Sequence, residues 1–395
     1  MTRLWDKGNS LDERVLRYTA GEDHQLDARL VAYDVVASTA HVNMLHAQGL
    51  LNESDHVAIV DGLSALAAEH ADGQWQISLE DEDAHTALES RLTERIGDAG
   101  GRMHLGRSRN DQVLAALRLY LRDAVTGLTE QTHDVVRALF TLAGREAETA
   151  LPGYTHMQQA MPSTVPLWCG GFASNLQDDA DALSRCRARI DQSPLGSAAG
   201  YGTPGIPIDR QYTADALGFT SVQEPVTAVQ LARGKAEASV CFELTVLLND
   251  CARLAADLLM FYTQEFAYVS LPESLTTGSS IMPQKRNPDV LELIRAAPAS
   301  AQACLNECLG VTAKLTSGYH RDLQRLKAPL FRCIDLASDT LAILRAMLDG
   351  VSFIPDNIQM SDGLHAAERA NTLVVEEGIS FREAYRRVAQ EYAKS

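Results

Sequence analysis

Three stretches of the sequence concentrate positive charge at points where long helical patterns break. Residues 101–110 (GRMHLGRSRN) contain three arginines and no acid, residues 283–287 contain two basic side chains, and residues 319–327 contain three against the single Asp322. The chain as a whole has a formal charge of −17, so these islands run against its average composition. Loops at helix ends are where polar side chains converge on ligands, and helix amino termini add N–H donors for anions. Any one island could be ordinary solvated charge, but three of them favour a site for a small anionic molecule.

The loop over residues 276–289 (TTGSSIMPQKRNPD) is the most informative of these stretches. Glycine, two serines and two prolines make it irregular, and Pro288 is well placed to open the next helix. A flexible linker has no physical need of Met, Gln, Lys and Asn between fixed prolines. We therefore predict that this loop carries part of the chemistry.

The elements that must hold these stretches are long helices. Between Arg233 and Tyr262, apolar residues recur at steps of three and four, which predicts one apolar seam on a helix of about eight turns. Similar seams run over residues 113–128, 176–183, 290–305 and 323–348. No convincing alternating strand pattern occurs. We expect an all-α protein whose long helices form a bundle.

Glycine and proline mark the boundaries between these helical segments. Such breaks occur at residues 97–101, 151–154, 193–209, 271–288 and 350–355. The sequence predicts an amino-terminal helical domain over residues 1–104, a central long-helix bundle over residues 105–350 and a small carboxyl-terminal helical domain over residues 351–395.

Composition excludes several classes of protein. The 395 residues are 46% hydrophobic and 22% charged, as in ordinary globular proteins, and the net negative charge argues against a nucleic-acid partner. The seven cysteines are scattered without C-x-x-C, which favours reduced thiols in a cytoplasmic protein over a disulfide framework or a structural zinc site. Residues 1–7 have no apolar run behind them, so no signal peptide is expected. No stretch reaches the roughly 18 apolar residues of a membrane span, so no membrane partner is expected either.

Residues 200–205 (GYGTPG) formally match a dinucleotide-binding fingerprint. No apolar strand precedes them, and Pro207 prevents a helix from opening directly after them. We predict a mobile loop here and no nucleotide cofactor.

The loop GSSIMPQKRNPD resembles the signature loop of the fumarase/aspartase superfamily, whose members cleave C–N or C–O bonds to release fumarate. Gln284 and Asp289 within it resemble the argininosuccinate lyase family in particular. Further similar stretches cover nearly the whole chain: EDAH (82–85), HLGRSRNDQVLAALRLYLRD (104–123), LPGYTHMQ (151–158), YHRDLQRLK (319–327) and GISFREA (378–384).

This resemblance implies a three-domain all-α fold and a β-elimination of argininosuccinate to arginine and fumarate, without a metal or an organic cofactor. In that family the first serine of the GSS pair is the base that takes the succinyl Cβ proton, so the resemblance assigns that role to Ser279. A serine hydroxyl is a poor base at neutral pH and needs a desolvated, electrostatically supported site. Lys285 and Asn287 match the residues that stabilise the dianionic aci-carboxylate intermediate. The residues that match those gripping the succinyl carboxylates are Ser108, Arg109 and Asn110.

The resemblance also places His156 near the leaving nitrogen, supported by Glu292. A departing guanidino group must be protonated, so a general acid is required. Whether His156 donates that proton itself, through water or by way of another group stays open. Further substrate-binding positions are matched by Asp27, Asp83, Thr155, Tyr319, Gln324 and Lys327. In the family one site combines stretches from three subunits of a homotetramer, which is the expected assembly here.

Three features depart from the commoner family pattern. Asp23 stands where a serine is usual, Arg325-Leu326 replaces an acidic pair, and the carboxyl-terminal domain is short. The first two concern how the amino-acid half of the substrate is held. They leave open a lyase for another N-substituted aspartate, such as a modified argininosuccinate or an adenylosuccinate-like compound. A non-catalytic, crystallin-like scaffold is a further alternative, but it has no need of the Ser279, Lys285 and Asn287 loop.

Overall fold

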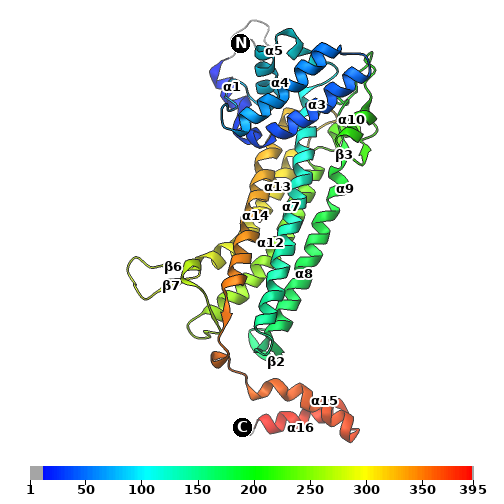
Figure 1. Cartoon of the computed structure of the whole chain (residues 1–395). Coiled ribbons are helices and arrows are strands. Elements are labelled where there is room, and N and C mark those ends of the chain that lie inside the picture. The colour runs from blue at the N-terminus through cyan, green and yellow to red at the C-terminus, as the bar shows by residue number, and fades with distance from the viewer. Residues whose placement is uncertain (1–11, 394–395) are drawn as a thin grey trace. The chain divides into compact units, whose positions relative to one another are not determined.

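The computed structural model describes residues 12–393, and helices dominate it (Figure 1). The all-α prediction is confirmed. Residues 1–7, from which we expect no signal peptide, lie outside the described part. Within residues 12–393 no helix has both the length and the apolar character needed to cross a membrane. The chain divides into two compact units: the first comprises residues up to 128, 182–245 and 300–336, and the second comprises 129–181, 246–299 and the residues from 337 onward.

The first unit begins with helices of differing length, three of which pack around a shared core. They are α1 (Glu13–Ala20), α2 (Asp23–Leu26), the 3₁₀ turn η1 (Asp27–Leu30), α3 (Val31–Ala47), α4 (Glu53–Ala71), α5 (Ala84–Ile96), α6 (Asp98–Gly101) and the 3₁₀ turn η2 (Arg102–His104). Several of these starts are capped by side chains, as when Asn52 accepts from Asp55 N–H before α4. Helices α3, α4 and α5 share a buried core that includes Met44, Ile59 and Leu88.

Shorter elements complete the first unit. They are α9 (Arg187–Ile190), β3 (Gln192–Ser193), α10 (Arg210–Ala216), β4 (Ser221–Val222), α11 (Ala228–Leu231) and the 3₁₀ helix η4 (Arg321–Leu326). Strands β3 and β4 pair in parallel. A second apolar cluster joins α3 and the long helix α7 (Arg109–Arg145) to these shorter elements through Leu119, Leu195 and Phe219.

Five long helices have residues in both units. They are α7 (Arg109–Arg145), α8 (Val165–Arg185), α12 (Lys235–Tyr262), α13 (Asp289–Thr312) and α14 (Lys327–Gly350). The seam predicted for residues 233–262 is confirmed, because Leu244, Leu247 and Leu254 on α12 are at most 1% exposed. The three domain boundaries expected from the sequence stay a prediction.

The second unit adds short strands and a pair of terminal helices. Its strands are β1 (Ala150–Thr155), β2 (Gln158–Thr164), β5 (Val269–Ser270), β6 (Thr277–Gly278), β7 (Arg286–Asn287) and β8 (Ser352–Phe353). Its remaining elements are the 3₁₀ turns η3 (Glu273–Leu275), η5 (Pro355–Asn357) and η6 (Asp362–His365), with α15 (Ala366–Glu377) and α16 (Phe381–Tyr392). Helices α15 and α16 pack through Ala370, Ala384 and Val388.

The hairpin of β1 and β2 was not apparent in the sequence. The two strands pair antiparallel, with an irregularity between Gly153 and Tyr154. Neither strand buries alternate residues, and β1 contains Pro152 and Gly153, so the alternation that reveals most strands is missing.

Candidate active site

A pocket of about 350 Å³ in the first unit gathers charged side chains from distant parts of the sequence. It is lined by α2 and η1, the turn before α5, the start of α7, Arg233 ahead of α12, and the segment from Tyr319 to Lys327. Eight residues predicted for the site line it: Asp27, Asp83, Ser108, Arg109, Asn110, Tyr319, Gln324 and Lys327. The structure therefore brings together two of the three positive islands.

The amino end of α7 is shaped by a reciprocal cap. The N–H of Ser108 donates to Oδ1 of Asp111 at 3.0 Å, and the N–H of Asn110 donates to Oγ of Ser108 at 3.3 Å. The side chains of Ser108, Arg109 and Asn110 thus enter the pocket where the helix dipole favours negative charge.

The buried carboxylate of Asp111 also anchors the loop over residues 193–209. Its Oδ2 accepts hydrogen bonds from the N–H groups of Gly196 at 3.1 Å and Ala198 at 2.9 Å. The GYGTPG stretch follows directly in this loop, and its residues lie in turns and irregular backbone ahead of α10. One side chain therefore holds both the start of α7 and this loop.

Arg109 forms an ion pair with Asp83 inside the pocket. Its guanidinium also lies 3.6 Å from Oε2 of Glu82. Burial by itself raises the pKa of Asp83, but the charges of Arg109 and His85 outweigh it and hold that pKa below the ordinary value. Asp83 is also the N-cap of α5, accepting from the Thr86 N–H at 2.9 Å, so Arg109 is fixed to a well-anchored carboxylate.

Lys327 is buried between two carboxylates at another part of the pocket wall. Its Nζ lies 2.6 Å from Oδ1 of Asp27 and 2.8 Å from Oδ2 of Asp23. Burial lowers the pKa of Lys327, but the two carboxylates outweigh it and raise that pKa above the ordinary value. Burial and the charge of Asp27 raise the pKa of Asp23 to about 6, against the lowering effect of Lys327. Asp23, a departure from the family pattern, is thus part of the charged wall.

A buried histidine at the pocket was missed by the sequence analysis as a site residue. His85 Nδ1 lies 2.5 Å from Oδ2 of Asp34 on α3. Burial lowers the pKa of His85, but the charge of Asp34 outweighs it and the pKa is raised. Its Nε2 is buried and has no hydrogen-bond partner among the described residues. The EDAH stretch was the available signal for His85, whereas nothing in the sequence pairs it with Asp34.

The side-chain amide of Gln324 is already hydrogen-bonded to the protein backbone. Its Nε2 donates to the backbone oxygens of Thr19 at 2.9 Å and Ala20 at 3.1 Å, at the end of α1. Arg321 donates to the same Thr19 oxygen at 2.8 Å. This part of η4 therefore fastens the end of α1 to the pocket wall.

The remaining predicted residues lie in the second unit. His156 and Met157 form the two-residue turn between β1 and β2, with φ of 51° and 62° respectively, and Thr155 is the last residue of β1. Non-glycine residues in this left-handed conformation are uncommon and concentrate at functional sites. The tip of the hairpin, including His156, is exposed to solvent.

Ser279 lies at the start of a loop closed by the pairing of β6 with β7. Its Oγ accepts hydrogen bonds from the N–H groups of Ile281 at 3.4 Å and Met282 at 3.2 Å. Lys285 is exposed in the same loop, Asn287 ends it, and Glu292 is an exposed residue in the first turn of α13. No hydrogen bond or ion pair within residues 12–393 joins this loop to His156.

The geometry divides the predicted chemistry between two sets of residues. The pocket offers cationic and hydrogen-bonding groups for carboxylates beside an acidic, lysine-containing wall. The loop of Ser279 offers a hydroxyl whose oxygen already accepts two backbone N–H bonds, which is the support that an alkoxide needs.

Comparison with known proteins identifies the family of the chain. A family model described as Lyase matches residues 14–302. The argininosuccinate lyase of Sorangium cellulosum (strain So ce56) is 47% identical over 99% of this chain and 91% of its own length. That of Thermotoga neapolitana is 38% identical over 99% of this chain and 98% of its own length.

Solved structures show the same fold. An EDDS lyase in complex with formate is 27% identical, has a TM-score of 0.82, and is matched over 96% of this chain and 76% of its own. A class II fumarase from Schistosoma mansoni is 16% identical with a TM-score of 0.80, over 96% and 88% of the two chains, and supports the fold alone. The resemblance expected from the sequence motifs is confirmed. This chain belongs to the argininosuccinate lyase family.

Proposed function

We propose that the protein catalyses the reversible β-elimination of argininosuccinate to L-arginine and fumarate, the last step of arginine biosynthesis. The observation that carries the proposal is the pocket in which Arg109, at the amino end of α7, shares one cavity with Lys327, Asp23 and Asp27. Such a cavity suits a ligand with a dicarboxylate at one end and an amino acid at the other.

Within this proposal the succinyl carboxylates are held by Ser108, Arg109 and Asn110. The amino-acid half is held by the wall that includes Lys327, with Asp27, Asp83, Thr155, Tyr319 and Gln324 as further binding residues. Arginine's planar guanidinium accounts for the choice at position 109, because its fork can meet a carboxylate with two N–H bonds. The ammonium group of the substrate's amino-acid half suits the acidic side chains beside Lys327.

The elimination itself moves one proton and one bonding pair at a time. Ser279, as alkoxide, takes the proton from the succinyl Cβ, and the electrons enter the adjacent carboxylate to form a dianionic intermediate. Lys285 and Asn287 stabilise that charge, as the N–H groups of Ile281 and Met282 stabilise the alkoxide. The intermediate then expels the guanidino nitrogen as the C–N bond breaks. That nitrogen takes a proton from the acid supplied at His156, whose ring Glu292 supports.

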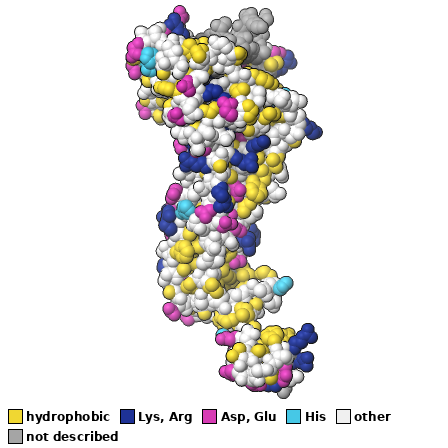
Figure 2. Space-filling model, turned by 90° about the vertical axis from the view of Figure 1, so that its right-hand side faces the viewer, with side chains coloured by type: hydrophobic (Ala, Val, Ile, Leu, Met, Phe, Trp, Pro, Cys, Tyr) yellow, Lys and Arg dark blue, Asp and Glu magenta, His cyan; other side chains and the backbone are white. Residues whose placement is uncertain are grey.

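We propose that these residues meet in a homotetramer in the cytoplasm. A serine base needs exclusion of water, whereas the loop of Ser279 is largely exposed in the single chain. Large apolar side chains on the long helices are also exposed, among them Phe140, Leu167, Phe242 and Leu293. Figure 2 shows hydrophobic side chains at the surface between the charged ones. All seven cysteines are free thiols, which fits a reducing compartment.

The test is a direct assay of the purified protein with argininosuccinate, following fumarate by its ultraviolet absorbance and arginine by chromatography. We expect equimolar arginine and fumarate. A folded oligomer that releases fumarate from another N-substituted aspartate, and none from argininosuccinate, would change the substrate and keep the elimination. No fumarate from either would support the scaffold alternative.

A further inference from the structure

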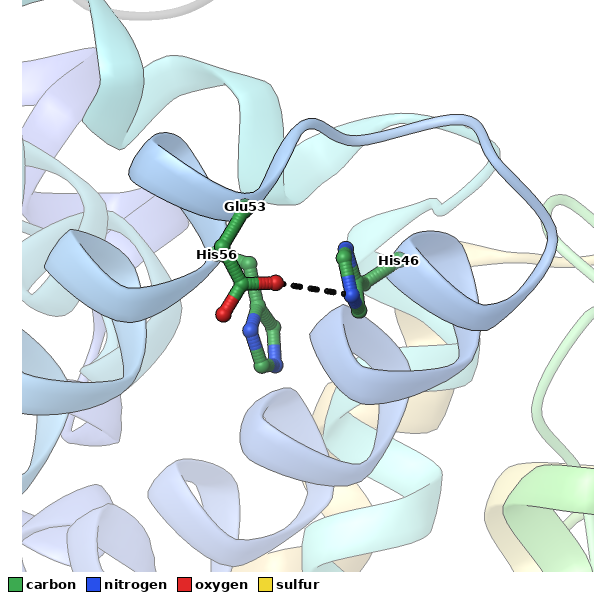
Figure 3. Close-up of side chains that lie close together, drawn as sticks. All are labelled: His46, Glu53 and His56. Carbon is green, nitrogen blue, oxygen red and sulfur yellow. Dashed lines mark ion pairs between the residues drawn. The ribbon is translucent and has the colours of Figure 1, made fainter.

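A cluster of two histidines and a glutamate lies at the turn between α3 and α4, and none of its members lines the pocket. His46 is in the last turn of α3, Glu53 is the first residue of α4, and His56 is three residues further along the same helix. Figure 3 shows the three side chains converging from the two helices. One candidate ligand atom from each residue lies within 4.8 Å of those of the other two, and no other such group occurs within residues 12–393.

Each imidazole has one nitrogen committed to an oxygen acceptor. His46 Nδ1 lies 3.1 Å from the backbone oxygen of Leu51, so this nitrogen must donate the proton. His56 Nε2 lies 2.8 Å from Oδ1 of Asn43, which likewise calls for a donor. A neutral imidazole carries only one N–H, so His46 Nε2 and His56 Nδ1 keep their lone pairs. Such an outer hydrogen bond to an oxygen is the arrangement that orients most metal-binding histidines.

Neither of these two lone pairs is satisfied by a hydrogen bond from a described residue. His56 Nδ1 is buried and has no hydrogen-bond partner among the described residues. His46 Nε2 lies 3.0 Å from Oε2 of Glu53. Because Nδ1 of His46 carries the proton that it donates to Leu51, Nε2 of the neutral ring presents a lone pair to the carboxylate oxygen of Glu53. This contact is favourable only if a cation or a second proton lies between the two atoms.

The turn that carries the cluster is firmly built. Gly49, with φ of 71°, follows the C-cap residue of α3, and the N–H of Leu50 donates to the oxygen of Leu45 at 2.9 Å. Asn52 caps α4 by accepting from the Asp55 N–H at 2.9 Å. The backbone positions of His46 and Glu53 are therefore set before any ion binds.

From these observations we propose that His46, Glu53 and His56 bind a borderline divalent metal ion such as Zn²⁺, one per chain, and that the ion clips α3 to α4. Imidazole and carboxylate donors suit zinc, nickel and copper. The rings of the two histidines stack, with centroids 4.5 Å apart and planes 15° apart, so their in-plane lone pairs are nearly parallel and the ring of His46 has to turn before both rings can bind one ion. The side chains of His46 and Glu53 are 37% and 74% exposed, which leaves them free to do so.

The experiment is a Zn²⁺ titration of the intact, chelator-treated protein by calorimetry, repeated with Co²⁺ for its visible absorption. We expect one site per chain whose affinity falls about tenfold or more in each of His46→Gln, Glu53→Gln and His56→Gln. Asn43→Leu removes the oxygen that orients His56 and is expected to weaken binding about tenfold. Zinc is also expected to raise the thermal unfolding midpoint of the wild type, and not that of His46→Gln/His56→Gln.

A matched control is the histidine–glutamate pair of His365 and Glu368, which lie 3.1 Å apart without a second imidazole. His365→Gln should bind zinc as the wild type does. If the wild type binds no zinc, or if His46→Gln/His56→Gln binds it with unchanged affinity, the site does not exist and the cluster is a surface ion pair only. Lyase activity reports folding of every variant, since none of these residues lines the pocket.

Discussion

The Nζ atom of Lys327 lies 2.6 Å from Oδ1 of Asp27, although 300 positions separate the two residues in the chain. Asp23 adds a second carboxylate at 2.8 Å, and the side chains of Asp27 and Lys327 are 0% and 4% exposed. One buried cation therefore pairs with two acids from the amino-terminal helices. This joins the amino-terminal segment to the start of α14 and completes one wall of the pocket.

Replacing this cation is expected to be costly for folding. Lys327→Met leaves two buried carboxylates facing each other without a counter-charge, and we expect a loss of about 3–5 kcal/mol in the free energy of unfolding. Urea unfolding at fixed protein concentration measures it. Lys327→Met/Asp27→Asn should recover part of the loss, and a single variant as stable as the wild type would contradict the triad.

Asp23 makes stability depend on pH in a particular direction. Its pKa of about 6 in the folded protein lies above the ordinary 3.8, so the folded state binds the proton more tightly. The stabilisation that protonated Asp23 gives the folded state is therefore fully present below about pH 4. It is lost as pH rises through 6, which lowers the free energy of unfolding by about 3 kcal/mol. Asp23→Asn should remove this slope between pH 4 and 6 in thermal unfolding curves, whereas the exposed Asp356→Asn should retain it.

Ser279→Ala tests the proposed base. We expect kcat to fall about 10²–10⁴-fold, because proton removal from Cβ loses its acceptor. The unfolding midpoint should stay the same, since the hydroxyl only accepts two long bonds within an exposed loop. Ser280→Ala, one residue further on, is the matched control and should keep its activity; equal losses in both variants would point to a disturbed loop.

His156→Asn tests the proposed acid while respecting the backbone. Asparagine tolerates the left-handed conformation seen at φ of 51°, so the hairpin should form as before. We expect kcat to fall about 10²-fold or more, since asparagine cannot donate a proton to the leaving nitrogen. Met157→Asn changes the other turn position and should leave kcat close to wild type; near-normal turnover in His156→Asn would place the acid elsewhere.

Arg109→Lys separates charge from geometry in the pocket. Lysine keeps the positive charge beside Asp83 but loses the planar fork, so we expect the KM for argininosuccinate and the inhibition constant of fumarate to rise about tenfold. The inhibition constant of arginine should change little, because the amino-acid half lies against the other wall. A variant that weakens arginine and fumarate alike would show a general loss of pocket structure.

The long helices were accessible to sequence reasoning because each carries its own apolar seam. The predicted segment 233–262 corresponds closely to α12 (Lys235–Tyr262). The hairpin of β1 and β2 was missed because neither strand buries alternate residues, and β1 includes a proline and a glycine. Periodicity reports burial of one face, and a strand whose buried residues do not alternate does not produce it.

The candidate site was accessible only in part. The eight predicted residues that line one pocket could be named from the sequence because the chain resembles known lyases there. The pairing of Asp34 with His85 spans 51 positions and follows from how α3 packs against α5, which no local pattern encodes. The same holds for Asp23, whose partner Lys327 is brought to it by the tertiary fold.

The carboxylate of Asp111 restricts how this protein can evolve or be redesigned. The same side chain completes the cap of α7 and holds the N–H groups of Gly196 and Ala198. A graft of a foreign loop between residues 193 and 209 must therefore present two backbone donors at the same spots, or it releases the helix end that carries Arg109. The loop and the helix end that carries Arg109 are consequently coupled through one carboxylate, so a redesign of the loop should change only residues beyond this anchor.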